Sequence, residues 1–175
     1  SGIMRSFEEY FYGGGLPETL LMKDKRSWIS SLFNKIFFGD LVARHQIRND
    51  FALKLMIRKL AESVKQPTSY NRIANIVSTA GKKISVDTVI DYIAYLRESW
   101  LILPFENLSA RLSERESNKK YYFVDNGVLG LFLIDANTSL LENIVAISLR
   151  KQYEDNVFFY NKNIEVDFVV PDDGL

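Results

Sequence analysis

Residues 140–170, LLENIVAISLRKQYEDNVFFYNKNIEVDFVV, determine how the rest of the chain is interpreted. Apolar residues at helical spacing come first, and two short strands follow, the second of which carries Asp167 among apolar neighbours. A carboxylate in an apolar setting is costly unless something compensates its charge. Two explanations stay open: a metal ion that Asp167 holds jointly with Glu142 of the helix, or a strand face that is open to water.

The composition is that of a globular chain. Its 175 residues are 47% hydrophobic, and 22 basic residues balance 22 acidic ones, so a packed core is expected and no overall field attracts nucleic acid. The absence of cysteine excludes disulfides and thiolate metal sites, in keeping with a reducing, cytoplasmic location. The single histidine, His45, excludes histidine clusters, and it has no carboxylate at helical spacing, so a solvated or capped side chain is expected.

The two ends predict a piece of a longer protein. The chain begins with Ser1 rather than methionine, and it stops just after PDDG at residues 171–174, a turn sequence that normally leads into a pairing strand. We therefore expect that strand beyond Leu175. No run of about 20 apolar residues and no signal-peptide pattern is present, which predicts no membrane partner.

Neither glycine-rich segment is a nucleotide-binding loop. A P-loop needs lysine and then Ser or Thr after its last glycine, but Leu16 and Pro17 follow the three glycines at residues 13–15. The segment at residues 81–83 fails because Lys83 stands in place of the Ser or Thr. The triple glycine is interpreted as a helix stop and a loop.

Hydrophobic periodicity predicts a mainly helical chain of class α+β. The expected helices cover residues 6–12, 27–38, 40–48, 50–65, 70–79, 86–100 and 140–153, with a break at Gly39. Strands are expected at residues 101–105, 121–124, 157–160 and 164–170. The three helices between residues 50 and 100, followed by a two-stranded ribbon with a charged tip, have the order of a winged helix-turn-helix.

The charges of the third of these helices argue against DNA. Asp87, Asp91 and Glu98 face only Arg97 there, so phosphate would repel the helix that a DNA reader places in the major groove. The ribbon, by contrast, has a small excess of basic residues. Binding of DNA and a purely structural packing role both stay open.

Four short motifs in order resemble a prokaryotic family of AAA-type ATPases, in the uncharacterised domain that follows the ATP-binding core. They are YFYGGGLPE at residues 10–18, KYYFVDNG at 120–127, LENIV at 141–145 and EVDF at 165–168. The resemblance implies an ATPase core before Ser1, which is an expected partner and would hold the ATP. It also implies a helical segment at residues 1–48, a winged helix at 49–119 and a truncated restriction-endonuclease-like α/β module at 120–175.

In that module the resemblance implies a magnesium site of three parts. Glu142 and Asp167 match the two acids, as catalytic residues and metal ligands, and a lysine strand that belongs beyond Leu175 is the third. We therefore expect Glu142 and Asp167 to meet in space without a metal and without cofactor chemistry in this chain. The chain itself is expected not to be an enzyme, although its parent is an expected ATPase.

Three functions follow in order of preference. The first is an interaction and regulatory module of an AAA-type ATPase, with nucleic-acid contact left open. The second is a metal-dependent nuclease module, and the third is a winged-helix regulator that binds DNA. A homo-oligomer is compatible with each of them.

Overall fold

Five strands form one sheet in the order β1-β3-β2-β4-β5. The computed structural model describes residues 2–81 and 83–171. All neighbouring strands are antiparallel except β2 and β4, which pair in parallel. The predicted α+β class is confirmed. The strands are β1 (Thr68–Ser69), β2 (Ile102–Asn107), β3 (Asn118–Phe123), β4 (Phe158–Asn161) and β5 (Glu165–Val169).

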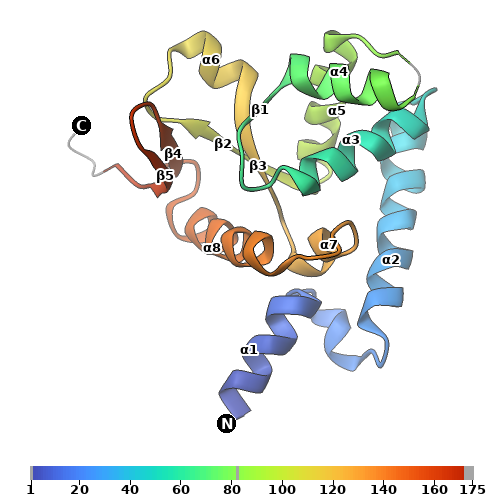
Figure 1. Ribbon diagram of the computed structural model, residues 1–175. Coiled ribbons are helices and arrows are strands. Elements are labelled where there is room, and N and C mark those ends of the chain that lie inside the picture. Colours follow the sequence, from blue (N-terminus) through green and yellow to red (C-terminus); the bar gives the residue numbers. More distant parts are fainter. Residues whose placement is uncertain (1, 82, 172–175) are drawn as a thin grey trace.

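Helices surround this sheet (Figure 1). The predicted helices agree with the observed ones to within a few residues, apart from the differences described below. The α-helices are α1 (Gly2–Gly13), α2 (Lys25–Lys35), α3 (Asp50–Glu62), α4 (Tyr70–Ala80), α5 (Val86–Glu98), α6 (Leu112–Ser117), α7 (Asn126–Gly130) and α8 (Asn137–Tyr153). A 3-10 helix, η1 (Pro17–Leu21), and a π-helix, η2 (Ile36–Val42), complete the list.

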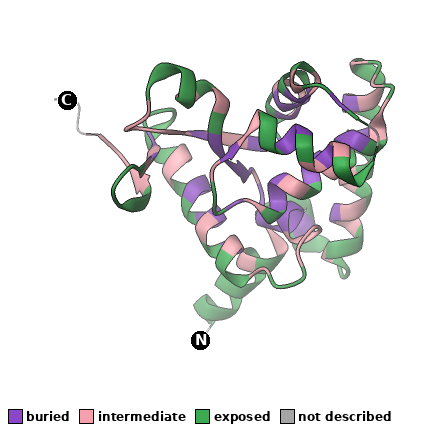
Figure 2. Cartoon of the chain, turned by 45° about the horizontal axis from the view of Figure 1, so that its top comes forward, coloured by how far each residue is buried: buried purple, intermediate pink, exposed green. Residues whose placement is uncertain are grey.

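Side-chain caps fix where several helices begin. Asn49 accepts a hydrogen bond from the backbone N–H of Ala52 at the start of α3, and Ser85 accepts one from Thr88 at the start of α5. Each cap satisfies an N–H that the first helical turn leaves free. The apolar faces of α3, α4 and α5 then form much of the core (Figure 2).

β3 is the centre of the fold. After Asn118 its residues are buried on both faces of the strand, because α3 and α8 both contact it. The β4–β5 hairpin folds back over the β2–β3 ribbon, since the ring of Phe168 lies 5.6 Å from that of Tyr122 and 6.0 Å from that of Phe105. β3 also runs across the predicted domain boundary at residues 119/120, and the three-part division of the chain stays a prediction.

Several local features differ from the sequence prediction. Gly39 does not break the helix, because the chain continues through it as η2. The prediction has no counterpart for four short elements, which are η1, β1, α6 and α7.

The apolar periodicity of residues 86–100 predicts that Trp100 points inward, but its side chain is 76% exposed. Its backbone φ is +55°, so it occupies the left-handed position that ends α5, where glycine is the usual residue.

Among the described residues, none of the helices is both long and apolar enough to span a bilayer.

Candidate functional site

Lys120 and four acidic or phenolic side chains form what we call the lysine cluster: Lys120, Tyr122, Glu142, Glu165 and Asp167. The Lys120 side chain is fully buried. Its Nζ donates to Asp167 Oδ1 at 2.8 Å and to Glu142 Oε1 at 3.2 Å, and it lies 3.7 Å from Glu165 Oε1. The sequence prediction that Glu142 and Asp167 meet in space is therefore correct in geometry. Their proposed catalytic role stays a prediction.

Three elements contribute to the lysine cluster. Lys120 and Tyr122 alternate along β3 and so share one face, which α8 and the folded-back β5 cover. Glu142 lies in the second turn of α8, and Asp167 lies in β5. Ion pairs of the lysine cluster thus connect the edge strand β5 to β3, although these two strands are not neighbours in the sheet.

Tyr122 also forms a hydrogen bond with Glu142. Its hydroxyl donates to Glu142 Oε1 at 2.7 Å. Burial raises the pKa of Tyr122 well above its ordinary value, and the nearby charge of Glu142 raises the pKa further. The phenol therefore stays protonated at neutral pH and serves as a hydrogen-bond donor rather than as a base.

The residues of the lysine cluster do not fit a magnesium ion. Such an ion needs an octahedral shell of oxygens at about 2.0–2.1 Å, but Lys120 Nζ already lies between the two carboxylates that would supply it. A buried ammonium also repels a second cation. Within residues 2–81 and 83–171, no group of three or more His, Cys, Asp or Glu side chains is arranged to hold a metal.

A second group of polar side chains lies next to the lysine cluster. It consists of Asp125, Asn126 and Asn143, and we call it the amide cluster. Asn143 Oδ1 accepts from the backbone N–H of Phe123 at 2.7 Å, and its Nδ2 donates to the carbonyl of Phe123 at 3.0 Å. One side-chain amide thus pairs with the end of β3 as a neighbouring strand would. The same Nδ2 donates to Asn126 Oδ1 at 3.0 Å.

The triple glycine packs against this amide cluster. Asp125 accepts from the backbone N–H of Gly15 at 2.7 Å and from that of Val128 at 3.1 Å. Gly14 has φ +78°, and a Cβ there would clash with the Asp125 carboxylate. The glycines therefore do more than end α1, because they let the backbone approach a buried carboxylate closely.

The amide cluster also anchors the first helix. Asn126 Nδ2 donates to the carbonyl of Phe11 at 2.9 Å and to that of Leu140 at 3.1 Å. The motifs at residues 10–18, 120–127 and 141–145 thus meet at one place. Adjacent residues of α8 belong to different clusters, because Glu142 is part of the lysine cluster and Asn143 is part of the amide cluster.

Sequence reasoning identified Glu142 and Asp167 but missed Lys120, Tyr122 and Asn143. A lysine followed by three aromatic residues at 120–123 is a signal in itself, because lysine is rarely found in a buried strand unless a carboxylate neutralises it.

The turn predicted at residues 171–174 is described only at Pro171, because residues 172–174 lie outside the described part of the chain. The predicted lysine strand after Leu175 lies outside it as well.

The basic residues of the predicted ribbon are mostly engaged within the protein. Arg115 donates to the carbonyls of Leu108 and Ala110, and Lys119 Nζ pairs with Glu106 at 3.0 Å and with Glu116 at 3.4 Å. Lys120 is buried. The positive charge that the sequence assigns to this ribbon is therefore largely neutralised.

His45 is held by aromatic stacking. Its ring lies 3.6 Å from that of Tyr95, nearly parallel, and its Nε2 is 3.9 Å from a carboxylate oxygen of Glu98. The tertiary structure thus supplies, from α5, the carboxylate that helical spacing could not.

The fold and its two polar clusters define a small α+β domain in which β3 and α8 are joined by buried polar groups. The model of the family described as a domain of unknown function (DUF8612) matches residues 4–147, so the chain belongs to this family. Three of the four sequence motifs lie inside the matched region, and the one at 165–168 lies beyond it.

Two relatives cover most of the chain. Uncharacterized protein MJ1544 of Methanocaldococcus jannaschii is 28% identical over 175 residues, which are 96% of this chain and 40% of the relative. An uncharacterized protein of Haemophilus influenzae is 28% identical over 170 residues, which are 93% of this chain and 42% of that relative. The chain therefore spans about two fifths of the length of these relatives. No solved structure shows a significant match.

Proposed function

We propose that this chain is an interaction and regulatory module of a longer AAA-type ATPase and that it docks on the ATPase core through α1. The observation that carries this proposal is the apolar surface of α1. None of its described residues, Gly2–Gly13, is buried, and Ile3 is 82% and Phe7 47% exposed. Exposed apolar residues gathered on one helix face are typical of protein interfaces.

The anchoring of α1 supports the same role. Its C-terminal half is fixed through Glu9, Phe11 and Tyr12, which contact Lys25, Asn126 and Asn137, while its N-terminal end points away from the body of the molecule (Figure 1). An isolated helix of fewer than about 12–15 residues is only marginally stable in water. A partner that covers the face of Ile3, Met4 and Phe7 would therefore stabilise it.

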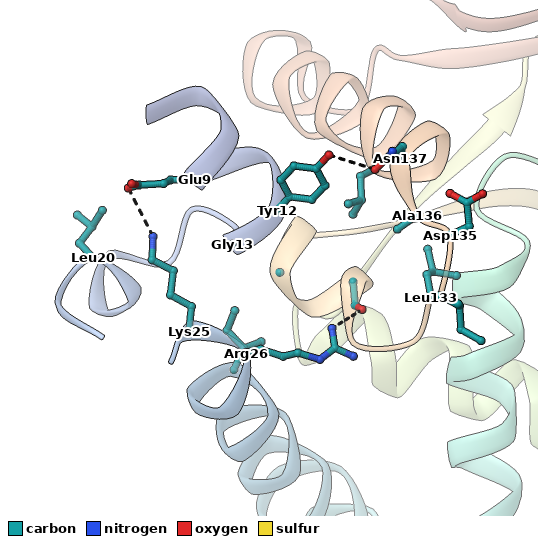
Figure 3. A pocket seen from close by; sticks show the side chains of 15 residues that line it. Glu9, Tyr12, Gly13, Leu20, Lys25, Arg26, Leu133, Asp135, Ala136 and Asn137 are labelled. Atoms are coloured by element: carbon teal, nitrogen blue, oxygen red, sulfur yellow. Dashed lines mark hydrogen bonds and ion pairs between the residues drawn. The ribbon is translucent and has the colours of Figure 1, made fainter. Parts of the chain in front are cut away.

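A cavity of about 820 Å³ lies between α1, η1, α2 and the segment before α8, and α1 contributes Glu9, Tyr12 and Gly13 to it (Figure 3). Polar side chains at its rim bond to one another: Lys25 lies 3.8 Å from Glu9, and Tyr12 donates to Asn137 at 3.2 Å. Arg26 donates to the carbonyl of Gly130 at 2.9 Å. The rest of the lining combines Asp135 with apolar side chains that include Leu20, Ile29 and Leu133.

Copurification tests this proposal. The parent's ATPase core and this chain would be expressed as separate polypeptides, the chain as wild type, Phe7→Glu or Leu112→Glu. Leu112 is a matched control, because it is also an exposed apolar residue, 76% exposed, but lies on α6. We expect the core to copurify with the wild type and with Leu112→Glu but not with Phe7→Glu. Copurification of all three, or of none, would contradict the proposal.

A winged-helix regulator that binds DNA is a second candidate. Strand β1 lies between α3 and α4 and pairs with β3, which is the strand arrangement of winged helices and supports this assignment. Exposed Asp87 and Asp91 on α5 oppose it, because they would face phosphate. Duplex binding that rises in the double variant Asp87→Asn/Asp91→Asn would support a DNA contact by α5, and no change would favour a packing role.

A metal-dependent nuclease module is the remaining candidate. The convergence of Glu142 and Asp167 supports it, and Lys120 between them opposes it. Incubation of the full-length parent with DNA and Mg²⁺ or Mn²⁺, and then of Asp167→Ala, is the direct measurement. Cleavage that the substitution abolishes would support a nuclease, whereas equal cleavage or none would exclude this site.

A further inference from the structure

We propose that Lys120 is the resident cation of the lysine cluster and holds α8 and β5 on β3 in the place where the family resemblance puts a divalent metal. While Lys120 is present, the cluster binds no Mg²⁺ or Mn²⁺. The acids at residues 142 and 167 therefore act in this chain as partners of an internal ammonium.

The first support is the position of Lys120 Nζ. The side chain is fully buried, and its three N–H donors face three carboxylates, at 2.8, 3.2 and 3.7 Å. A lysine buried in this way is stable as a cation only if its partners are ionised and close. The ring of Phe159, 5.7 Å away, adds a weaker attraction for the ammonium.

The second support is the use of the acceptor atoms. Oε1 of Glu142 accepts from both Lys120 and Tyr122, and Asp167 Oδ1 accepts from Lys120. A metal that took these oxygens would have to displace the ammonium or lie against it. Like charges in a partly buried site repel strongly because water screens them poorly there.

The third support is how the remaining negative charge is treated. One ammonium faces three carboxylates, but the side chains of Glu165 and Asp167 are each 54% exposed. Water therefore solvates the excess charge at the open side of the cluster. The buried side, which contains Glu142, is neutralised by Lys120 and needs no further cation.

Mn²⁺ binding tests the proposal directly. The full chain would be titrated with Mn²⁺, with bound ions counted by electron paramagnetic resonance and the unfolding temperature measured in parallel. Wild type, Asp167→Asn, Lys120→Met and Lys119→Met would be compared. Lys119→Met is a matched control, since Lys119 is the adjacent lysine of β3 and pairs with Glu106 and Glu116 instead.

We expect no bound Mn²⁺ and no shift in the unfolding temperature for wild type, Asp167→Asn and Lys119→Met. Lys120→Met should unfold at a lower temperature than wild type, because its three carboxylates then lack a cation. Mn²⁺ bound by wild type and lost in Asp167→Asn would overturn the proposal, as would a Lys120→Met protein that is as stable as wild type.

The proposal can still be tested if Lys120→Met does not fold. In that case wild type is compared with Asp167→Asn alone. Equal numbers of bound Mn²⁺ ions in these two proteins would show that the lysine cluster binds no metal and would support the proposal. A lower count in Asp167→Asn overturns it.

Discussion

The amide cluster and the lysine cluster are built on the same two elements, β3 and α8, yet water reaches only one of them. Asn143, Asn126 and Asp125 are buried and pair largely with backbone groups. Lys120 is equally buried, but two of its carboxylate partners are half open to solvent. The amide cluster therefore behaves as part of the core, whereas the lysine cluster forms a boundary between core and surface.

The adjacent residues Glu142 and Asn143 show the same contrast between the lysine cluster and the amide cluster. Both are second-turn residues of α8, but one completes a charge balance and the other completes the hydrogen bonding of a strand end. When one member of a buried hydrogen-bond network is removed, groups are left that water cannot easily reach. The partners of a half-exposed ion pair can be rehydrated.

The largest effect is expected from Asn143→Ala. It leaves the N–H and carbonyl of Phe123 and the Asn126 side chain without their partner. At ~1–3 kcal/mol for each of these three stranded groups, the free energy of unfolding should fall by at least about 3 kcal/mol. Urea denaturation measures this, with exposed Asn163→Ala as a control that should change it by less than about 0.5 kcal/mol.

A smaller loss is expected from Glu142→Ala. Lys120 would keep Asp167 and Glu165 as partners, so the cost should be about 2–3 kcal/mol, below the ~3–5 kcal/mol of a wholly unpaired buried charge. The same denaturation experiment compares the two neighbours on α8. A Glu142→Ala protein less stable than Asn143→Ala would reverse our ranking of the clusters.

Gly14→Ala tests the contact between the glycine loop and Asp125. The left-handed backbone at Gly14 and the clash with Asp125 should lower the free energy of unfolding by about 2 kcal/mol. Gly39→Ala is the matched control, because no described atom lies within 4 Å of a Cβ there. It should be neutral or stabilising by up to about 1 kcal/mol, as expected for glycine in a helix. Equal effects would mean that the loop does not need its glycine.

The smallest effect is expected in alkaline solution. Burial holds the pKa of Tyr122 above its ordinary value of 10.0. Above about pH 10 the unfolded chain loses this proton while the folded chain keeps it, so stability is complete below pH 10 and falls as the pH rises, by up to about 1.4 kcal/mol per pH unit.

Tyr122→Phe should make this decline shallower. It should not abolish the decline, since burial also raises the pKa of Tyr121. Unfolding by urea at several pH values between about 9 and 11 measures the slope. An unchanged slope in Tyr122→Phe would show that the lysine cluster does not keep this phenol protonated.

Much of the local structure could be predicted from the sequence. Periodic apolar residues predicted α3 and α5 to within a few residues, and Ser85 predicted where α5 begins, because these signals act within one or two turns. The same reasoning failed at Gly39 and Trp100. The helix continues through Gly39 as η2, and α5 ends before Trp100, whose backbone is left-handed and whose side chain is exposed.

The amino-acid sequence was sufficient to predict the longer helices, four of the strands and the unusual acids Glu142 and Asp167. What neutralises these acids became apparent only in the folded chain. Lys120 is 22 residues from one acid and 47 from the other, and it meets both because the β4–β5 hairpin folds back over β3. In this arrangement the ring of Phe168 lies 5.6 Å from that of Tyr122. Local patterns carry no information on such a contact, so residues 140–170 pointed to a metal where the folded chain holds its own cation.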